Sequence, residues 1–267
     1  METPSDVLPT FPIEEYLTKR SEDGRLKVAA ESLIRVCMSD FGFKYMGREI
    51  SSKTLTSQEN GTNKPRRYGV VDIKVAESHG YHPADMPIRE DVAEPSGPGM
   101  SDAENRVFIG DGDPSSGVKP GDKYSGKPIP RGGCAGQAAE TLGTKQLGRT
   151  AKQINNISFA RSMENSAVKT VFRGWSSCMA AQGYKFDSPM RALEQSLTSQ
   201  VTASEVAMAK ADVNCKRKVN LVGVWFTVES EIQKELIGKQ EETLVGEKKS
   251  LTDALRKAAK ISSGGGQ

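Results

Sequence analysis

Four cysteines and two histidines carry most of the chemistry that this sequence offers. The cysteines are Cys37, Cys134, Cys178 and Cys215, and the histidines are His79 and His82. Zinc sites favour closely spaced ligand pairs, whereas the cysteines lie far apart in the sequence. A thiol or serine nucleophile needs a histidine base, yet both histidines fall in a turn-like segment that we expect to be solvated. We therefore expect no metal, no cofactor and no catalytic residues.

The segment Asp111-Gly112-Asp113-Pro114-Ser115-Ser116-Gly117 resembles a calcium-binding loop in outline. An EF-hand loop has a glycine at its centre and a bidentate glutamate at its end. Here the glycine comes one place late and no glutamate closes the loop. We interpret this segment as two consecutive turns.

A short pattern occurs twice in the chain. Cys37 to Tyr45 and Cys178 to Phe186 both consist of Cys-Met, three residues, Gly, an aromatic, Lys and a second aromatic. The pattern predicts a helix with a core-facing cysteine in its last turns, a glycine that ends it, and an aromatic that folds back over the end. The alternative is a common helix-ending pattern without shared ancestry.

Proline placement divides the chain into three regions. Nine of the 13 prolines lie from Pro65 to Pro130, and only Pro189 follows Arg131. Because proline breaks helices, its near absence permits long helices in the C-terminal half. We expect an N-terminal helix ending near Phe41, a Gly/Pro-rich irregular middle to about Gly133, and a helical remainder. The fold class is therefore mainly α.

The C-terminal half predicts a long antiparallel helical hairpin. One helix is expected from about Gln153 to Gln182 and a brief one after Pro189. Thr202 to Glu205 is typical of a capping box, in which Glu205 reaches back to the helix start. A single last helix is expected from there to about Ala259.

The outer part of that last helix is polar on most faces. A seven-residue step nevertheless links Ile237, Leu244, Leu251 and Ala258. We expect this end to protrude as a solvated helix or to form half of a coiled coil through which the chain oligomerises. The basic run Lys216-Arg217-Lys218 is interpreted as a solvated helix face.

The middle region predicts short elements. A capped two-turn helix is expected from Asp72 to Gly80, and Ser101 to Glu104 is a capping box that opens another short helix. Tyr68 to Val71 is the one stretch with strand-like character.

Two disulfides are the simplest use of the cysteines. Each copy of the repeated pattern is followed by one more cysteine, so we expect bonds from Cys37 to Cys134 and from Cys178 to Cys215. The hairpin favours the second bond, because its cysteines lie on the inward stripes of two linked helices. Four cysteines allow three connectivities, and the other two stay open. The chain then divides into residues 1–150, closed by the first bond, and 151–267, closed by the second.

Composition limits the classes of partner. The chain has 267 residues and a net charge of +3 with acids and bases nearly balanced, so we expect no nucleic-acid partner. We also expect no transmembrane segment, and the start from Met1 to Asp6 lacks the features of a signal peptide. Arg66, Arg67, Tyr68 and Tyr81 are candidates for a binding surface, although the favoured alternative is that the tyrosines pack the middle region onto the helices.

Several short motifs resemble a family of uncharacterised exported actinobacterial proteins of the streptomycete type, some of them lipoproteins. The motifs are Arg66-Arg67-Tyr68-Gly69, Gly80-Tyr81, Gly132-Gly133-Cys134, Trp175 with Cys178-Met179, and Ala211-Asp212-Val213 with Cys215-Lys216 and Trp225. They span about Leu26 to Lys239. The resemblance implies an exported location and disulfides, and the family has no established activity to carry over. The family's export signal and lipid-attachment cysteine are missing here, so we expect a mature form.

The sequence favours a non-enzymatic binding or accessory protein of the cell envelope or extracellular space. Its partner is an unknown protein or envelope component, and its role serves export or cell-wall assembly. One alternative is a structural coiled-coil protein. A third is a thiol-dependent redox enzyme or a hydrolase, for which the location can be cytoplasmic.

Overall fold

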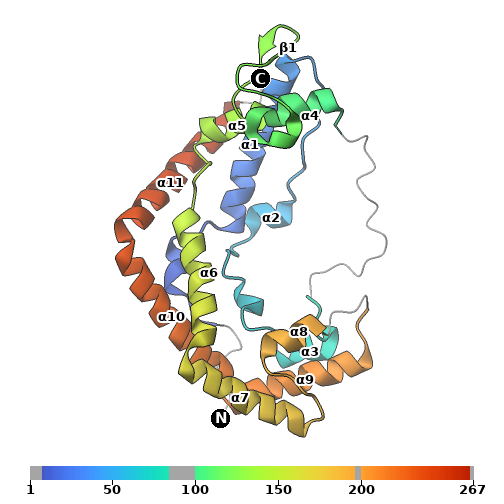
Figure 1. Ribbon diagram of the computed structural model, residues 1–267, viewed down its shortest axis with the longest axis vertical. Helices are drawn as coiled ribbons and strands as arrows, with labels where there is room; N and C mark the ends of the chain where they lie inside the picture. Colours follow the sequence, from blue (N-terminus) through green and yellow to red (C-terminus); the bar gives the residue numbers. More distant parts are fainter. Residues whose placement is uncertain (1–7, 84–99, 196–199, 265–267) are drawn as a thin grey trace. The chain divides into compact units, whose positions relative to one another are not determined.

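The computed structural model describes residues 8–83, 100–195 and 200–264 (Figure 1). The start of the chain, where the sequence lacks signal-peptide features, lies outside these ranges. The described residues are mainly helical, as predicted. They fold into two compact units, each assembled from three separate stretches of chain. Unit 1 combines Met1–Glu15, Thr62–Glu94 and Lys152–Gln240, and unit 2 combines Tyr16–Gly61, Pro95–Ala151 and Glu241–Gln267.

Unit 1 is built from helices of very different lengths. Its elements are η1 (Pro12–Glu15), η2 (Lys64–Arg66), α3 (Ile73–His79), α7 (Ser166–Ala181), α8 (Pro189–Gln195), α9 (Ala203–Lys218) and α10 (Leu221–Lys239), together with most of α6 (Arg149–Glu164). The expected hairpin is present as α7 and α9, with α8 in the link between them. The short capped helix expected from Asp72 is α3.

Two asparagines interrupt the long helices that the sequence predicts. Asn165 is extended and accepts a hydrogen bond from the amide of Ala167, so it ends α6 and caps α7. Asn220 adopts the left-handed conformation at φ 49° and separates α9 from α10. Asparagine tolerates this conformation better than most residues, which explains why the prediction of one uninterrupted last helix is wrong.

Large aromatic side chains form the core of unit 1. Trp225 stacks on Tyr68 and on Phe159, and Phe172 meets it edge-on. Trp175 and Trp225 are both fully buried. Tyr68 lies in a turn after η2, so the strand expected over Tyr68 to Val71 is absent from this part of the structure.

Unit 2 gathers the elements of the N-terminal and middle regions around the last helix. These are α1 (Arg20–Asp40), α2 (Ser52–Thr56), α4 (Asp102–Ile109), η3 (Gly110–Gly112), η4 (Pro114–Ser116), β1 (Lys123–Tyr124), β2 (Lys127–Pro128), α5 (Gly133–Leu142) and α11 (Glu241–Gly264). The two short strands pair antiparallel. Ser125 and Gly126 turn the hairpin with φ values of 47° and 80°, as a type I′ turn requires.

The last helix neither protrudes nor leaves its apolar stripe free. Leu244, Ala254 and Ala258 of α11 are buried. Ala254 and Ala258 pack with Leu26 and Ala29 of α1 in one apolar cluster. Leu251 and Ala258 of the seven-residue step therefore pack within unit 2, which corrects the expectation of a protruding, solvated end.

Two glycines let α4 and α5 approach closely in unit 2. Gly110 and Gly133 have φ values of 57° and 63°. A Cβ atom on Gly110 would lie 2.2 Å from the backbone nitrogen of Gly133, and one on Gly133 would lie 2.3 Å from the carbonyl oxygen of Phe108. Both positions therefore exclude any side chain, and this contact sets the start of α5, where Cys134 lies.

Candidate functional site

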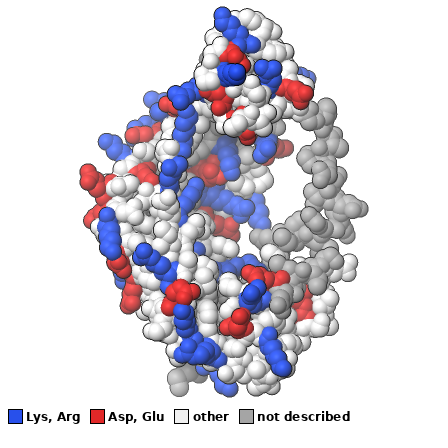
Figure 2. Space-filling model, viewed as in Figure 1, with Lys and Arg blue, Asp and Glu red and all other residues white. Residues whose placement is uncertain are grey.

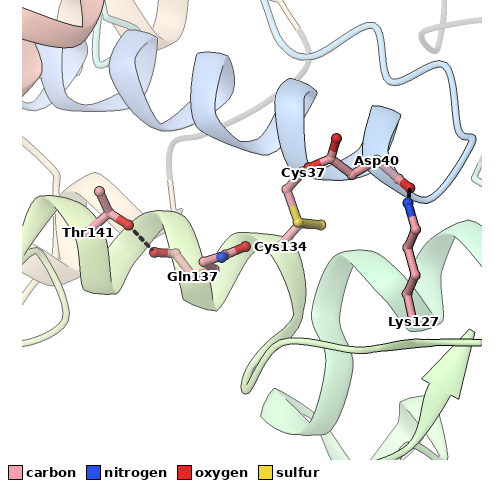
Figure 3. Close-up of a disulfide and its surroundings, with 6 residues drawn as sticks. All are labelled: Cys37, Asp40, Lys127, Cys134, Gln137 and Thr141. Atoms are coloured by element: carbon pink, nitrogen blue, oxygen red, sulfur yellow. Dashed lines mark hydrogen bonds between the residues drawn. A yellow bond between two sulfur atoms is a disulfide. The ribbon is translucent and has the colours of Figure 1, made fainter.

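All four cysteines form disulfides in the predicted pairs. Cys37 of α1 bonds to Cys134 of α5 in unit 2, and Cys178 of α7 bonds to Cys215 of α9 in unit 1. Figure 3 shows the first bond beside Asp40, whose carbonyl oxygen accepts a hydrogen bond from Lys127. Since no free cysteine is present, the four sulfur atoms offer neither a thiol nucleophile nor a thiolate metal ligand.

The two copies of the repeated pattern end their helices with the same backbone hydrogen bonds. In α1, the amide of Phe43 donates to the carbonyl oxygen of Met38 at 3.0 Å. In α7, the amide of Tyr184 donates to the carbonyl oxygen of Met179 at the same distance. Both methionines are fully buried. These are the hydrogen bonds of a Schellman motif, as the sequence predicts.

The glycine at the centre of each copy adopts the left-handed conformation that ends a helix. Gly42 has a φ of 84° and Gly183 a φ of 88°. In each copy, the side chain two places before the cysteine also donates a hydrogen bond to a backbone carbonyl oxygen in the segment after the glycine. Arg35 donates to the carbonyl oxygen of Met46, and Ser176 donates to that of Phe186. The second cysteines differ, because Cys134 opens α5 whereas Cys215 lies in the last turns of α9.

Arg67 and Tyr68, two residues expected on a binding surface, are buried around Glu229 in unit 1. The guanidinium of Arg67 pairs with the carboxylate of Glu229, whose side chain has an exposed fraction of 0%. The hydroxyl of Tyr68 donates to the same carboxylate at 2.7 Å. Arg67 also lies over the rings of Phe11 and Phe159. Burial, followed by the charge of Glu229, raises the pKa of Tyr68.

Arg66 and Tyr81, the other two candidates, belong to a second buried network. Arg66 donates to the carbonyl oxygens of Tyr81 and His82, and burial lowers its pKa. Tyr81 is fully buried. The packing alternative therefore describes the two tyrosines, which are buried and cannot form an exposed binding surface, whereas Arg66 is half-buried.

Glu205 joins this second network instead of completing its capping box. Its backbone amide donates to the hydroxyl of Thr202, as predicted. Its carboxylate, however, accepts the amide of Tyr81 at 2.8 Å and lies 2.9 Å from Nδ1 of His82. The side chain of His82 is only 15% exposed, so the expectation of a solvated loop is also wrong. A buried carboxylate at Nδ1 orients the imidazole ring, as in histidine bases.

Asp212 and Lys216 form a third buried polar group, which the sequence did not reveal. Lys216 donates to Asp212 at 2.8 Å and to the carbonyl oxygen of Val70 at 2.9 Å, and both side chains are almost fully buried. The indole of Trp175 donates to the other oxygen of Asp212. The solvated-face interpretation of Lys216 is therefore wrong. The i,i+4 spacing within the Asp-Val-Asn-Cys-Lys stretch was the available signal.

In the loop that resembles a calcium site, the aspartate carboxylates accept hydrogen bonds from backbone amides. Asp113 caps η4 through the amide of Ser115, and this bond lowers the pKa of the carboxyl. Asp111 accepts the amide of Gly132. The interpretation as two turns is confirmed by η3 and η4. Across the described ranges, no group of three or more His, Cys, Asp or Glu side chains is placed to hold a metal ion.

A surface cleft with a volume of about 690 Å³ lies in unit 1, beside the second copy of the pattern. Ser176 and Ala180 of α7 form one wall, Arg191 comes from α8, and Lys185, Phe186 and Asp187 lie between them. On the face shown in Figure 2, Lys and Arg side chains are interspersed with Asp and Glu. The cleft has two cationic side chains and one anionic side chain.

Fold and site together define a helical protein with two disulfides, one in each compact unit. Comparison with protein-family models, curated proteins and solved structures found no match to this chain. Within the described ranges, none of the helices has both the length and the apolar character that crossing a bilayer requires.

Proposed function

We propose that this chain is a non-enzymatic binding or accessory protein of the cell envelope or extracellular space. The observation that carries the proposal is that all four cysteines are used in disulfides. Structural disulfides form and persist in oxidising compartments and are rare among cytosolic proteins. The resemblance to exported actinobacterial proteins supports the same location.

A binding role is favoured over a catalytic one by how the polar side chains are used. Several charged groups of unit 1 that have specific partners, such as Glu229 and Asp212, are fully buried inside the core. There they stabilise the fold and have no access to a substrate. The packing of α11 on α1 likewise gives the seven-residue step a role other than oligomerisation.

The experiment is fractionation of cells that express the complete gene in its native host, combined with thiol labelling of the denatured, unreduced protein. A maleimide reagent of high mass should leave the exported protein unshifted on a gel, because no thiol is free. After reduction of the disulfides, four maleimide labels should attach to each chain. Free thiols in a protein confined to the cytosol would contradict both the location and the structural use of the cysteines.

The pair formed by His82 and Glu205 is the one observation that favours a hydrolase instead. Replacing His82 with asparagine keeps a donor near Glu205 but removes the base. The proposal expects the biological role of this variant to persist once the fold is verified by circular dichroism. A variant that folds normally and loses all biological activity would support the enzyme.

A further inference from the structure

One residue of the repeated pattern has no role in the fold. The cysteines form the disulfides, the methionines fill the core, and the glycines supply the left-handed backbone. The lysine between the two aromatics, Lys44 in one copy and Lys185 in the other, is exposed. Among the described residues, neither lysine has an ion pair or side-chain hydrogen bond. The pattern therefore includes an exposed cation without a polar partner among the described residues.

In the second copy, this cation lies beside another one. Lys185 and Arg191 both line the cleft between α7 and α8. Arg191 lies 3.7 Å from Glu194, and both side chains are more than 60% exposed, at 63% and 65%. Such a solvated pair contributes little free energy, so Arg191 can exchange Glu194 for a ligand at low cost.

The lining of the cleft indicates the chemistry of that ligand. A guanidinium and an ammonium together suit a phosphate or carboxylate, because arginine binds two oxygens and lysine adds a point charge. Phe186, which is half-buried, offers an apolar surface beside them. The cleft is shallow and open to solvent, so a ligand bound there keeps part of its surface in water.

We propose that this cleft binds a small organic oxyanion. Lys185 and Arg191 hold its phosphate or carboxylate group, and the apolar part of the ligand packs against Phe186. Asp187 limits the total negative charge that the site accepts. The inference deepens the proposed binding function by naming a ligand class and a site, and it rests on that function.

Phenyl phosphate is a suitable probe because it combines an oxyanion with an aromatic ring. The experiment is a titration of the ¹⁵N-labelled full chain, with its disulfides intact, followed by amide chemical shifts. Phenyl phosphate should shift the amides of Ser176, Ala180, Lys185, Phe186, Asp187 and Arg191. Inorganic phosphate should shift the same amides but bind more weakly, because it lacks the contact with Phe186. Benzoate in a parallel titration distinguishes a carboxylate from a phosphate preference.

The double variant Lys185→Ala/Arg191→Ala should weaken phenyl phosphate binding by about 10-fold or more, which corresponds to about 1.4 kcal/mol. The matched control is Lys169→Ala/Arg173→Ala, which removes the same two charge types from exposed positions of α7 outside the cleft. The control should bind as the parent does. Asp187→Asn should bind more tightly than the parent.

Two results would overturn the proposal. One is a set of shifts spread over lysines and arginines across the surface and reduced equally by both double variants, which would indicate non-specific attraction. The other is the lack of any shift in the cleft with all three probes. Neither result bears on the cysteines or on the location of the protein. The proposed function is therefore tested independently, by the fractionation and thiol-labelling experiment.

Discussion

The guanidinium of Arg67 binds the carboxylate of Glu229, 162 positions further along the chain. Ser158 and Gln233 also donate to this carboxylate, and the hydroxyl of Tyr68 donates to its second oxygen. One carboxylate thus joins the turn after η2 to both α6 and α10. Charged groups buried in this way strongly penalise the loss of one partner.

Removal of either partner of this pair should destabilise the protein. We expect Arg67→Met or Glu229→Leu alone to lower the free energy of unfolding by about 3–5 kcal/mol, since the remaining charge stays buried. The double variant should lose less free energy of unfolding than the two single variants lose in sum. Urea denaturation measures all three. Arg256→Ala, which removes an exposed pair with Asp253, should change stability by less than about 1 kcal/mol. Equal losses of stability in the core and surface variants would contradict the assignment of Arg67 and Glu229 as a buried ion pair.

Glycine replacements should separate backbone strain from steric exclusion. Gly42 and Gly183 have open space where a Cβ would lie, so alanine there should cost about 1 kcal/mol from the positive φ alone. Gly110→Ala and Gly133→Ala should cost several times more, because the new methyl group would overlap backbone atoms. Thermal unfolding of the four variants tests this order. Similar melting temperatures for all four would count against the close approach of α4 and α5.

Each disulfide should stabilise its own unit. By loop-closure entropy, removing the bond across 37 residues should cost about 4 kcal/mol and removing the bond across 97 residues about 5 kcal/mol. Cys178→Ser/Cys215→Ser should therefore increase amide exchange mainly in α7 and α9, and Cys37→Ser/Cys134→Ser mainly in α1 and α5. Hydrogen exchange with mass spectrometry locates the effect. If the protection of all helices fell equally in both variants, the two units would not be independent in stability.

Alkaline pH should destabilise the folded state through its buried tyrosines. Burial, then a hydrogen bond to Glu31, raises the pKa of Tyr45 to about 12, and burial raises the pKa of Tyr68 and Tyr81 further. The unfolded chain releases these protons near pH 10. The folded state then binds more protons, so the stabilisation is complete below about pH 10 and decreases as pH rises.

Phenolate absorbance at increasing pH measures this effect directly. Of the six tyrosines, these three should ionise late and together with unfolding. Tyr45→Phe should remove one late-titrating group and weaken the pH dependence of stability. A single transition of all six near pH 10, with the fold intact, would show that the three phenols are accessible to solvent.

A charge placed on the inner face of α11 should disrupt unit 2. Ala254→Glu introduces a long anionic side chain against α1 and should cost about 2 kcal/mol or more. Thr252→Glu places the same side chain on the exposed face of α11 and should stay within about 0.5 kcal/mol of the parent. Light scattering controls for self-association. If Ala254→Glu dissociated an oligomer without destabilising the chain, α11 would be a coiled-coil helix after all.

Patterns that act over a few residues were read correctly from the sequence. The cap at Thr202, the glycine-ended helices and the Cys178–Cys215 bond all depend on neighbours along the chain or on a short link. The Cys37–Cys134 bond spans 97 positions and was predicted from the order of the cysteines relative to the repeated pattern. Glu205 marks the limit of this approach, because its local pattern is that of a capping box. Its carboxylate instead binds the amide of Tyr81, 124 positions away. A local rule has no information about such a partner.

The buried charges were missed for a related reason. Lys216 stands in a basic run that is typical of a solvated face, and only the position of Val70 and Asp212 around it makes its burial favourable. Asn220 ends α9 without any proline or glycine to signal it. The four candidates for a binding surface were selected by residue type, and residue type does not distinguish an aromatic that packs the core from one that meets a ligand.

The discontinuous composition of the two units has a consequence for biosynthesis. One apolar cluster of α1 is completed only by α11, which is synthesised much later. Residues from Thr62 onward likewise wait for α9 and α10. Unit 1 therefore lacks part of its chain until α10 has been made, and unit 2 until α11 has been made. If the chain is exported as proposed, late closure of both units would keep it unfolded for passage through a translocation channel.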